Sequence, residues 1–520
     1  TIVKIAITSS VVLLCSGFAL YSFFRLSAAE GQKDFNLYEL VPSTTSAVFV
    51  TDDVLEFVAE VDELTCSKNQ QYLYVSKLFS YLKQSLYALS EDTPHGLSRQ
   101  MNQMLISFHE PDNERNQVLY CRLGNGDKEL VNRFVRKYIS SLYPPKTFIY
   151  KGEEIIIYPM ADGDFLACYL TSDFMALSFQ KKLIENVIDA YKSGKSLADD
   201  STFTGIRAPK KSAAAATIYT RMQGMMGWTE FDMKMKDDFI YFSGITHDAD
   251  TCFAFINQLR QQQSVKGFPG EVLPSTAFYF SRQGITDWVS LLSYGNAQGQ
   301  SVPARTSEVQ NRDKEFSRYL MENAGQDLVA CLFQREDTLQ GAAAVLSLSV
   351  ADVTEAERML RALVNAASAD EGRRNPRITF CYTVNKAYPI YRLPQTTLFE
   401  QLTSFAEPTL DVYAAFYGGR LLLAPDADAL AHYIRQLDKG EVLNGAMVYQ
   451  TGMDHLSDSY HFMLMADFDH IFQQSENHVR FVPDFFLRNA DFFRHFTLFV
   501  QFACADGVVY PNIVLKYKSE

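Results

Sequence analysis

The sequence predicts an α+β protein in which an N-terminal transmembrane helix precedes two tandem repeats, each an antiparallel sheet with helices packed on one face. Three observations predict this class. An uncharged hydrophobic run lies near the N-terminus, a strand-turn-strand-helix pattern occurs twice, and a polar stretch separates the two copies. The predicted domains are an anchor and tether at residues 1–28, a first repeat at 29–265, and a second repeat with a Phe-rich insertion at 266–520.

The first element is the run Ile5–Phe24, which contains no charged residue and lies between Lys4 and Arg25. About twenty residues at about 1.5 Å each match a bilayer core of about 30 Å. The apolar part of a cleavable signal peptide is shorter, at about 7 to 15 residues. We therefore expect Ile5–Phe24 to cross the lipid bilayer. Two alternatives remain, cleavage at Ser27–Ala29 and lipidation of Cys15.

The order of the segments and the composition indicate where the protein lies and which partners are disfavoured. An N-terminal anchor followed by a long acidic globular part is typical of single-pass proteins of the inner membrane, with the globular part in the periplasm. The net charge of −13 and the pI near 5.3 argue against nucleic acid as a partner, because phosphate binding needs a basic face. With 47% hydrophobic residues, the 520-residue chain is long enough for more than one core.

The repeated pattern begins with two strands and a turn. In the first copy, Leu166–Leu170 reads as a strand and Met175–Phe179 as its return strand. In the second copy the strands are Val412–Phe416 and Leu421–Leu423, joined by Gly418-Gly419. A Gly-Gly pair suits a two-residue hairpin turn, because both turn residues can adopt positive φ.

A helix follows each hairpin and supports a duplication. Apolar residues recur at helical spacing in both copies, at Ile184, Val187, Ile188 and Tyr191 and at Leu430, Tyr433, Ile434 and Leu437. Gly194 and Gly440 then occupy the position of a C-cap glycine. The whole segment keeps one displacement, as Leu177 and Leu423 illustrate. We therefore predict an internal duplication, the alternative being two unrelated amphipathic helices after hairpins.

The ends of the repeats carry further matching signals. Leu40–Thr44 reads Leu-Val-Pro-Ser-Thr, precedes an apolar strand, and has a counterpart at Val272–Thr276. Between the copies, Gln261–Gly270 is the best candidate for a linker.

These signals resemble a known class of sequence. A hydrophobic anchor, the start at Leu40–Thr44, and a helix that ends in the polar segment Gly194–Asp200 are similar to bacterial exported, membrane-anchored proteins of a domain-of-unknown-function family. The second copy departs from this signature at Gly440–Asn444. The resemblance implies export and an unassigned role, and it supplies no catalytic residues.

Linear motifs for chemistry are absent from the sequence. It contains no Gly-x-Ser-x-Gly elbow, no His-Glu-x-x-His and no P-loop. With Cys15 set aside, the cysteines are odd in number and include no Cys-x-x-Cys pair, which fits neither a disulfide framework nor a zinc site. We therefore predict no catalytic residue, no metal ligand and no cofactor.

Histidine is concentrated late in the chain and carries the alternative hypothesis. The late histidines are His432, His455, His461, His470, His478 and His495, and the nearby carboxylates are Asp454, Asp458, Asp467 and Asp469. Imidazole and carboxylate together can bind a metal or transfer protons. Their spacing fits no ligand motif, which favours ordinary surface or hydrogen-bonded histidines.

The Phe-rich insertion of the second repeat gives the only candidate interaction residues. They are Phe485, Phe486, Phe492 and Phe493. Exposed, they would form a lipid- or protein-binding surface. The interpretation we favour is core, because a helical insertion in one repeat can bury an otherwise open sheet edge.

The function that these patterns favour is binding or scaffolding. We expect an extracytoplasmic protein that binds a protein partner in the cell envelope, as an accessory subunit of an envelope complex. The alternative is an envelope hydrolase that uses the His/Asp-rich region of the second repeat.

Overall fold

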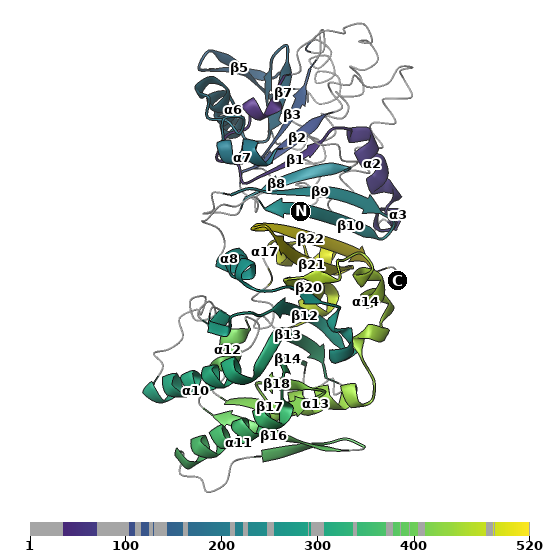
Figure 1. Cartoon of the computed structure of the whole chain (residues 1–520). Coiled ribbons are helices and arrows are strands. Elements are labelled where there is room, and N and C mark those ends of the chain that lie inside the picture. Colours follow the sequence, from purple (N-terminus) through teal and green to yellow (C-terminus); the bar gives the residue numbers. More distant parts are fainter. Residues whose placement is uncertain are drawn as a thin grey trace. The chain divides into compact units, whose positions relative to one another are not determined.

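The computed structural model divides the chain into two compact units, unit 1 ending at Cys252 and unit 2 running from Phe253 to Lys518 (Figure 1). The structure describes residues 35–69, 103–109, 116–123, 128, 143–159, 165–207, 214–221, 227–246, 254–289, 291–292, 306–335, 341–370, 378–384, 386–394, 396–403, 411–474, 482 and 484–518. The predicted boundary at residue 265 lies within unit 2. Close to it, Gln262 accepts a hydrogen bond from the Thr286 N–H of the same unit at 2.7 Å.

Unit 1 is built on an antiparallel sheet. Its strands are β1 (Ala47–Thr51), β2 (Met104–Phe108), β3 (Gln117–Arg122), β4 (Lys146–Tyr150), β5 (Glu153–Pro159), β6 (Phe165–Leu170), β7 (Phe174–Ser178), β8 (Ala216–Thr220), β9 (Thr229–Lys236) and β10 (Phe239–Thr246). Its described helices are η1 (Leu37–Glu39), α2 (Val54–Glu63), α3 (Thr65–Lys68), α6 (Lys181–Ser193) and α7 (Ser201–Ile206). The strand order is β4-β5-β6-β7-β3-β2-β1-β8-β9-β10, with every pair antiparallel.

Helices cover both faces of the sheet in unit 1. Phe57 of α2 packs in one core cluster with Cys168 of β6, whereas Ile184 of α6 packs in a second cluster with the next strand residue, Tyr169. Because neighbouring residues of a strand point to opposite faces, the two clusters lie on opposite sides of the sheet. Figure 1 shows α2 on one side of these strands and α6 and α7 on the other.

Among the described residues, unit 2 has more helices than unit 1, around a sheet of the same kind. Its strands are β11 (Val265–Lys266), β12 (Ala277–Gly284), β13 (Ala324–Gln334), β14 (Ala342–Val350), β15 (Ile378–Tyr382), β16 (Ala387–Pro394), β17 (Asp411–Tyr417), β18 (Arg420–Ala424), β19 (Ser459–Tyr460), β20 (Phe462–Asp467), β21 (Phe496–Ala505) and β22 (Val508–Tyr517). Its described helices are α8 (Ala254–Gln261), η2 (Pro269–Val272), α10 (Ser307–Asn323), α11 (Val353–Asp370), α12 (Leu398–Leu402), α13 (Ala427–Asp438), η3 (Leu443–Gly445), α14 (Met447–Met453), α15 (Phe468–Phe472), α17 (Asp484–Arg488) and α18 (Ala490–Phe493).

The strand order of unit 2 repeats that of unit 1. It is β15-β16-β17-β18-β14-β13-β12-β20-β21-β22, again with every pair antiparallel, while β11 and β19 form a small separate sheet. The central hairpins also share a register, because Cys168 lies opposite Leu177 in unit 1 and Ala414 lies opposite Leu423 in unit 2. The two sheets therefore have one topology.

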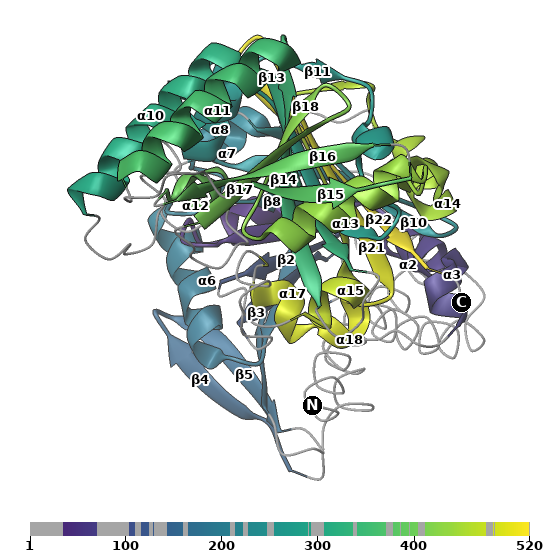
Figure 2. The same ribbon diagram turned by 90° about the horizontal axis from the view of Figure 1, so that it is seen from below.

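Helices also cover both faces of the sheet in unit 2. Tyr391 of β16 donates a hydrogen bond to Glu357 of α11, and Cys381 of β15 donates one to the Ala431 carbonyl of α13. Ile378 lies opposite Tyr391 across the two strands, so Tyr391 shares a face with Ile378 and not with Cys381. Figures 1 and 2 show α10 and α11 on one side of β16 and α13 on the other.

The predicted fold class is therefore wrong. Instead of an α+β layer with helices on one face, the described residues form mostly antiparallel sheet, and helices lie on both faces. The physical reason is visible in the strands themselves. β7 is buried at every residue, and β13 is buried from Asp327 to Phe333. Strands covered on both faces have no polar face and so lose the alternation of apolar and polar residues.

The predicted fold class also included an N-terminal transmembrane helix. The run Ile5–Phe24 lies outside the described residues. Among the helices that the structure describes, none is both long and apolar enough to cross a membrane. The structure therefore gives this part of the predicted fold no support.

Several local predictions are confirmed. Gly194 and Gly440 adopt φ of +63° and +75° after α6 and α13, as expected for glycines that end helices. Gly418 and Gly419 adopt φ of +57° and +78° in the turn between β17 and β18. These positions depend on the local backbone alone, so the sequence pattern is sufficient to predict them.

Candidate ligand-binding groove

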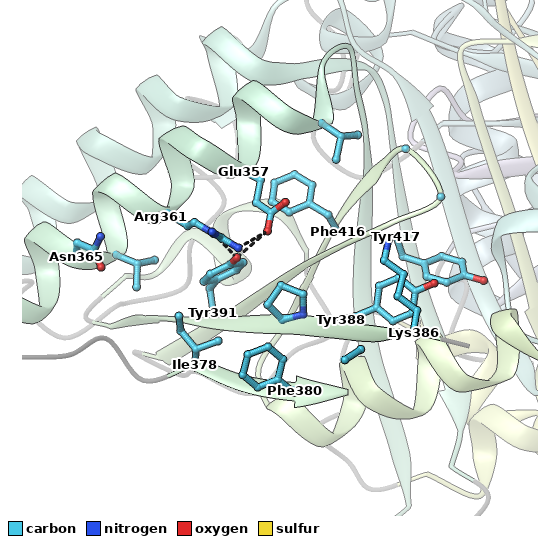
Figure 3. Close-up of a pocket in the computed structure, with 16 residues that line it drawn as sticks. Glu357, Arg361, Asn365, Ile378, Phe380, Lys386, Tyr388, Tyr391, Phe416 and Tyr417 are labelled. Carbon is cyan, nitrogen blue, oxygen red and sulfur yellow. Dashed lines mark hydrogen bonds and ion pairs between the residues drawn. The ribbon is translucent and has the colours of Figure 1, made fainter. Parts of the chain in front are cut away.

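A groove of about 770 Å³ lies on unit 2 between α11, the β15–β16 hairpin and the turn between β17 and β18 (Figure 3). This volume is within the range of about 300 to 1,000 Å³ that is usual for ligand sites. The turn contributes Gly418 and Gly419, and a Cβ atom added at either glycine would meet no atom within 4 Å. The two glycines therefore leave one side of the groove open.

Helix α11 supplies the polar wall. Glu357, Arg361 and Asn365 recur every fourth residue and line the groove together. Leu360 and Val364 of the same helix are both 1% exposed and pack into the core. Because residues four apart lie on the same helix face, burial of the apolar stripe fixes the direction of the polar side chains.

A hydrogen-bond chain joins this wall to the sheet. Nε of Arg361 donates to the Tyr391 hydroxyl at 2.6 Å, and that hydroxyl donates to Oε1 of Glu357 at 2.7 Å. Arg361 also pairs with Glu357 at 3.1 Å. Burial, and then the hydrogen bond to Glu357, raise the pKa of Tyr391 to about 12, and the hydrogen bond from Arg361 raises the pKa of the guanidinium.

These pKa shifts define what the chain of groups can do. A catalytic acid or base works best when its pKa is near the operating pH. Tyr391 stays protonated and Arg361 stays charged at neutral pH. The arrangement therefore suits holding a ligand better than transferring a proton.

The sheet supplies the aromatic wall. Phe380 and Phe416 line the groove on the face that α11 covers (Figure 3). Tyr388 and Tyr417 also border the groove, but by the same register they belong to the α13 face, where the Tyr388 hydroxyl donates to Asp438 at 3.4 Å. Phe380 is 48% exposed, which is unusual for so large an apolar side chain. The groove therefore presents exposed aromatic surface.

A second cation lies at the rim of the groove, by the β15–β16 hairpin. The ammonium of Lys386 is 5.0 Å from the centre of the Tyr388 ring, within the range of a cation–π contact. Lys386 is itself exposed. Lys386 therefore places positive charge at the rim of the groove on the α13 side, whereas Arg361 places it on the α11 side, in a chain of net charge −13.

The predicted Phe residues lie elsewhere in unit 2. Phe493 is 6% exposed, and its ring centre is 4.8 Å from that of Phe486 and 4.9 Å from that of Phe492. Phe486 and Phe492 are half-buried, and Phe468 of α15 completes the cluster. The side chain of Phe485 lies outside the described residues. This packing favours the core interpretation over an exposed surface.

Three of the late histidines that the structure describes make separate contacts. His470 pairs with Asp467 at 3.3 Å, and this hydrogen bond raises the pKa of His470. Nδ1 of His461 accepts a hydrogen bond from the Cys504 N–H, and His432 bonds within its own helix. His478 lies outside the described residues. In the part of the chain that the structure describes, no group of three or more His, Cys, Asp or Glu residues is placed to hold a metal ion.

Comparison with known proteins identifies no relative. No protein-family model matches the sequence, and no curated protein or solved structure shows significant similarity to the chain.

Sequence reasoning did not find the groove, although two signals for it exist. Glu357, Arg361 and Asn365 share one helix face, and β15 alternates exposed Ile378 and Phe380 with smaller residues. Each signal is ordinary alone. Their meaning comes from the pairing of β15 with β16, which brings Ile378 opposite Tyr391 and so beside α11.

Proposed function

We propose that the chain is a binding protein and that the groove of unit 2 holds a segment of a protein partner that is apolar and carries negative charge. The observation that carries this proposal is the exposed apolar side chains of Ile378 and Phe380 beside Arg361 of α11, with Lys386 at the hairpin rim of the groove. Aromatic rings supply large apolar contact area. Arg361 and Lys386 supply charge complementarity, which contributes to specificity and to the rate of association.

A protein segment fits the groove better than a buried small molecule. Apolar exposure continues past the groove along β15, where Tyr382 is 70% exposed, and into the following turn, where Val384 is 95% exposed. Exposed apolar patches that have a polar rim mark interaction surfaces. The partner is therefore expected to extend beyond the 770 Å³ cavity.

Photo-cross-linking of the full chain in its own cells tests the proposal. A benzophenone amino acid is placed at Asn365, which lines the groove, and in a control at Arg358, which lies on the same helix and is 69% exposed but does not line the groove. We expect a discrete protein adduct from position 365 alone. We also expect Lys386→Glu to reduce its yield at least tenfold.

Two results contradict the proposal. Equal adducts from both positions would show nonspecific contact, and an adduct that Lys386→Glu leaves unchanged would exclude the charge complementarity. A small molecule in place of a protein would appear as a low-mass adduct. The resemblance to exported proteins and the envelope location remain predictions, which fractionation of cells would test.

A further inference from the structure

Strand β15 is the last strand in the order of unit 2, and among the described residues it pairs only with β16 (Figure 2). The N–H of Thr383 donates to the Lys386 carbonyl at 2.9 Å across the turn. Backbone groups of an antiparallel strand alternate in direction, so Cys381 and Thr379 also bond to β16. The N–H and C=O groups of Phe380 therefore point away from β16, to the open edge.

The residues on either side of Phe380 follow the same pattern. By alternation, the backbone groups of Ile378 and Tyr382 also point to the open edge. Pro389 supports this register, because it lies opposite Phe380, where its missing N–H costs no bond to β15.

The side chains on this edge are apolar and exposed. Ile378, Phe380 and Tyr382 are 38%, 48% and 70% exposed, and they share the sheet face that α11 covers. The strand reads Ile-Thr-Phe-Cys-Tyr, without a charged residue or a proline. Proteins usually protect edge strands with such residues, and an unprotected apolar edge is a site for pairing with another chain.

The sequence of β15 is complementary to itself. In an antiparallel pair with a two-fold axis at Phe380, this residue lies opposite its own copy and Ile378 lies opposite Tyr382 of the copy. All three positions direct their backbone groups outward, so each opposed pair exchanges hydrogen bonds. The opposed side chains are aromatic or aliphatic, and pairs of this kind stabilise antiparallel sheets.

From this register we infer that β15 pairs with β15 of a second copy of the chain, which makes a two-fold dimer with a continuous sheet. Such an interface is isologous and closes at two copies, so it does not propagate into a fibre. Ile378 and Phe380 also line the groove, so the dimer brings two grooves together on one face. The inference goes beyond the proposed function and does not depend on which ligand the groove holds.

Introducing a charged side chain at the two-fold axis provides the test. Phe380→Lys and Phe380→Glu each place like charges directly opposite in the dimer, which disfavours pairing. By sedimentation velocity of the full chain, we expect each variant alone to dimerise at least tenfold more weakly than the wild type. We expect an equimolar mixture to recover the dimer, because the introduced ammonium then meets the introduced carboxylate.

A matched control exists in unit 1. Ile149 of edge strand β4 is 70% exposed, and β4 has the same place in the strand order of unit 1. Ile149→Lys should therefore leave the dimer unchanged.

A backbone substitution separates pairing from apolar contact. Tyr382→Pro removes an outward N–H without breaking the ladder to β16, whereas Tyr382→Ala removes only the side chain. We expect the proline variant to weaken the dimer more than the alanine variant, while the circular dichroism spectrum stays unchanged.

Three results overturn the inference. One is a wild-type chain that remains monomeric up to about 100 µM, where a specific protein dimer is expected to be populated. Another is failure of the mixture of Phe380 variants to recover the dimer. The third is equal weakening by Ile149→Lys.

Discussion

Replacing Phe493 with alanine should destabilise unit 2. Phe493 is 6% exposed, and its ring packs against Phe486, Phe492 and Phe468 at centre distances of 4.8, 4.9 and 5.6 Å. Truncation of a buried Phe removes apolar contacts and leaves a cavity, at a cost of about 3 to 5 kcal/mol. For a unit of this size, each kcal/mol lowers the melting temperature by about 2 to 4 °C, so the expected decrease is roughly 6 to 20 °C.

The two tryptophans of the chain provide the assay. Trp228 lies in unit 1 and Trp288 in unit 2, and both are buried. In a Trp228→Phe background, the fluorescence of Trp288 reports the unfolding of unit 2 in the full chain. Thermal unfolding of this background with and without Phe493→Ala gives the shift directly.

Leu487→Ala is the matched control. Leu487 belongs to the adjacent helix α17 and is 37% exposed, so its truncation should change the melting temperature by only a few degrees. If Phe493→Ala left the melting temperature of unit 2 within that range, the ring would contribute little to the core. The reasoning from burial would then be refuted, and the Phe-rich segment would regain its interpretation as an interaction surface.

Two further predictions concern a half-buried histidine and a buried glycine. Burial lowers the pKa of His109 to about 4 in the folded chain, so the stability that the neutral imidazole contributes is present above pH 6.5 and is lost as the pH falls toward 4. Between pH 7 and pH 4, the free energy of unfolding measured with denaturant should fall by roughly 3 kcal/mol less in His109→Gln than in the wild type. An equal fall in both proteins would contradict a neutral imidazole in the folded state. A Cβ added at Gly452 of α14 would lie 2.2 Å from the ring of Phe499, whereas a Cβ added at Gly445 of η3 would meet nothing within 4 Å. Gly452→Ala should therefore destabilise unit 2 by about 1 to 3 kcal/mol more than Gly445→Ala. Equal unfolding midpoints of the two variants would contradict this close packing.

The hairpins and the helices that follow them were predictable because their signals are local. Gly194 and Gly440 end helices by adopting positive φ, which depends only on the residue and its neighbours. The common displacement of Leu177 and Leu423 likewise reappears as a common register in two hairpins. A periodicity of apolar residues reports the conformation of its own segment, so a single sequence is enough to read it.

The covering of the sheets was not predictable in the same way. An apolar run such as the one in β6 is consistent with a strand buried on both faces, but it does not say which helices cover each face. That choice brings Cys168 against α2 and Tyr169 against α6, although the two residues are adjacent in the chain. The one-face prediction failed because helix placement depends on contacts between distant segments.

The sequence by itself determined the local conformations of this protein, its acidic charge and its repeated hairpin and helix pattern. Only the tertiary structure decided where the groove lies. Glu357, Arg361 and Tyr391 form the polar wall of the groove because α11 packs on the face of β16 that carries Tyr391. Phe380 is exposed because β15 is the last strand of its sheet. Both facts follow from the order in which strands pair, and that order is set by the burial of apolar surface over the whole unit and not by any one segment.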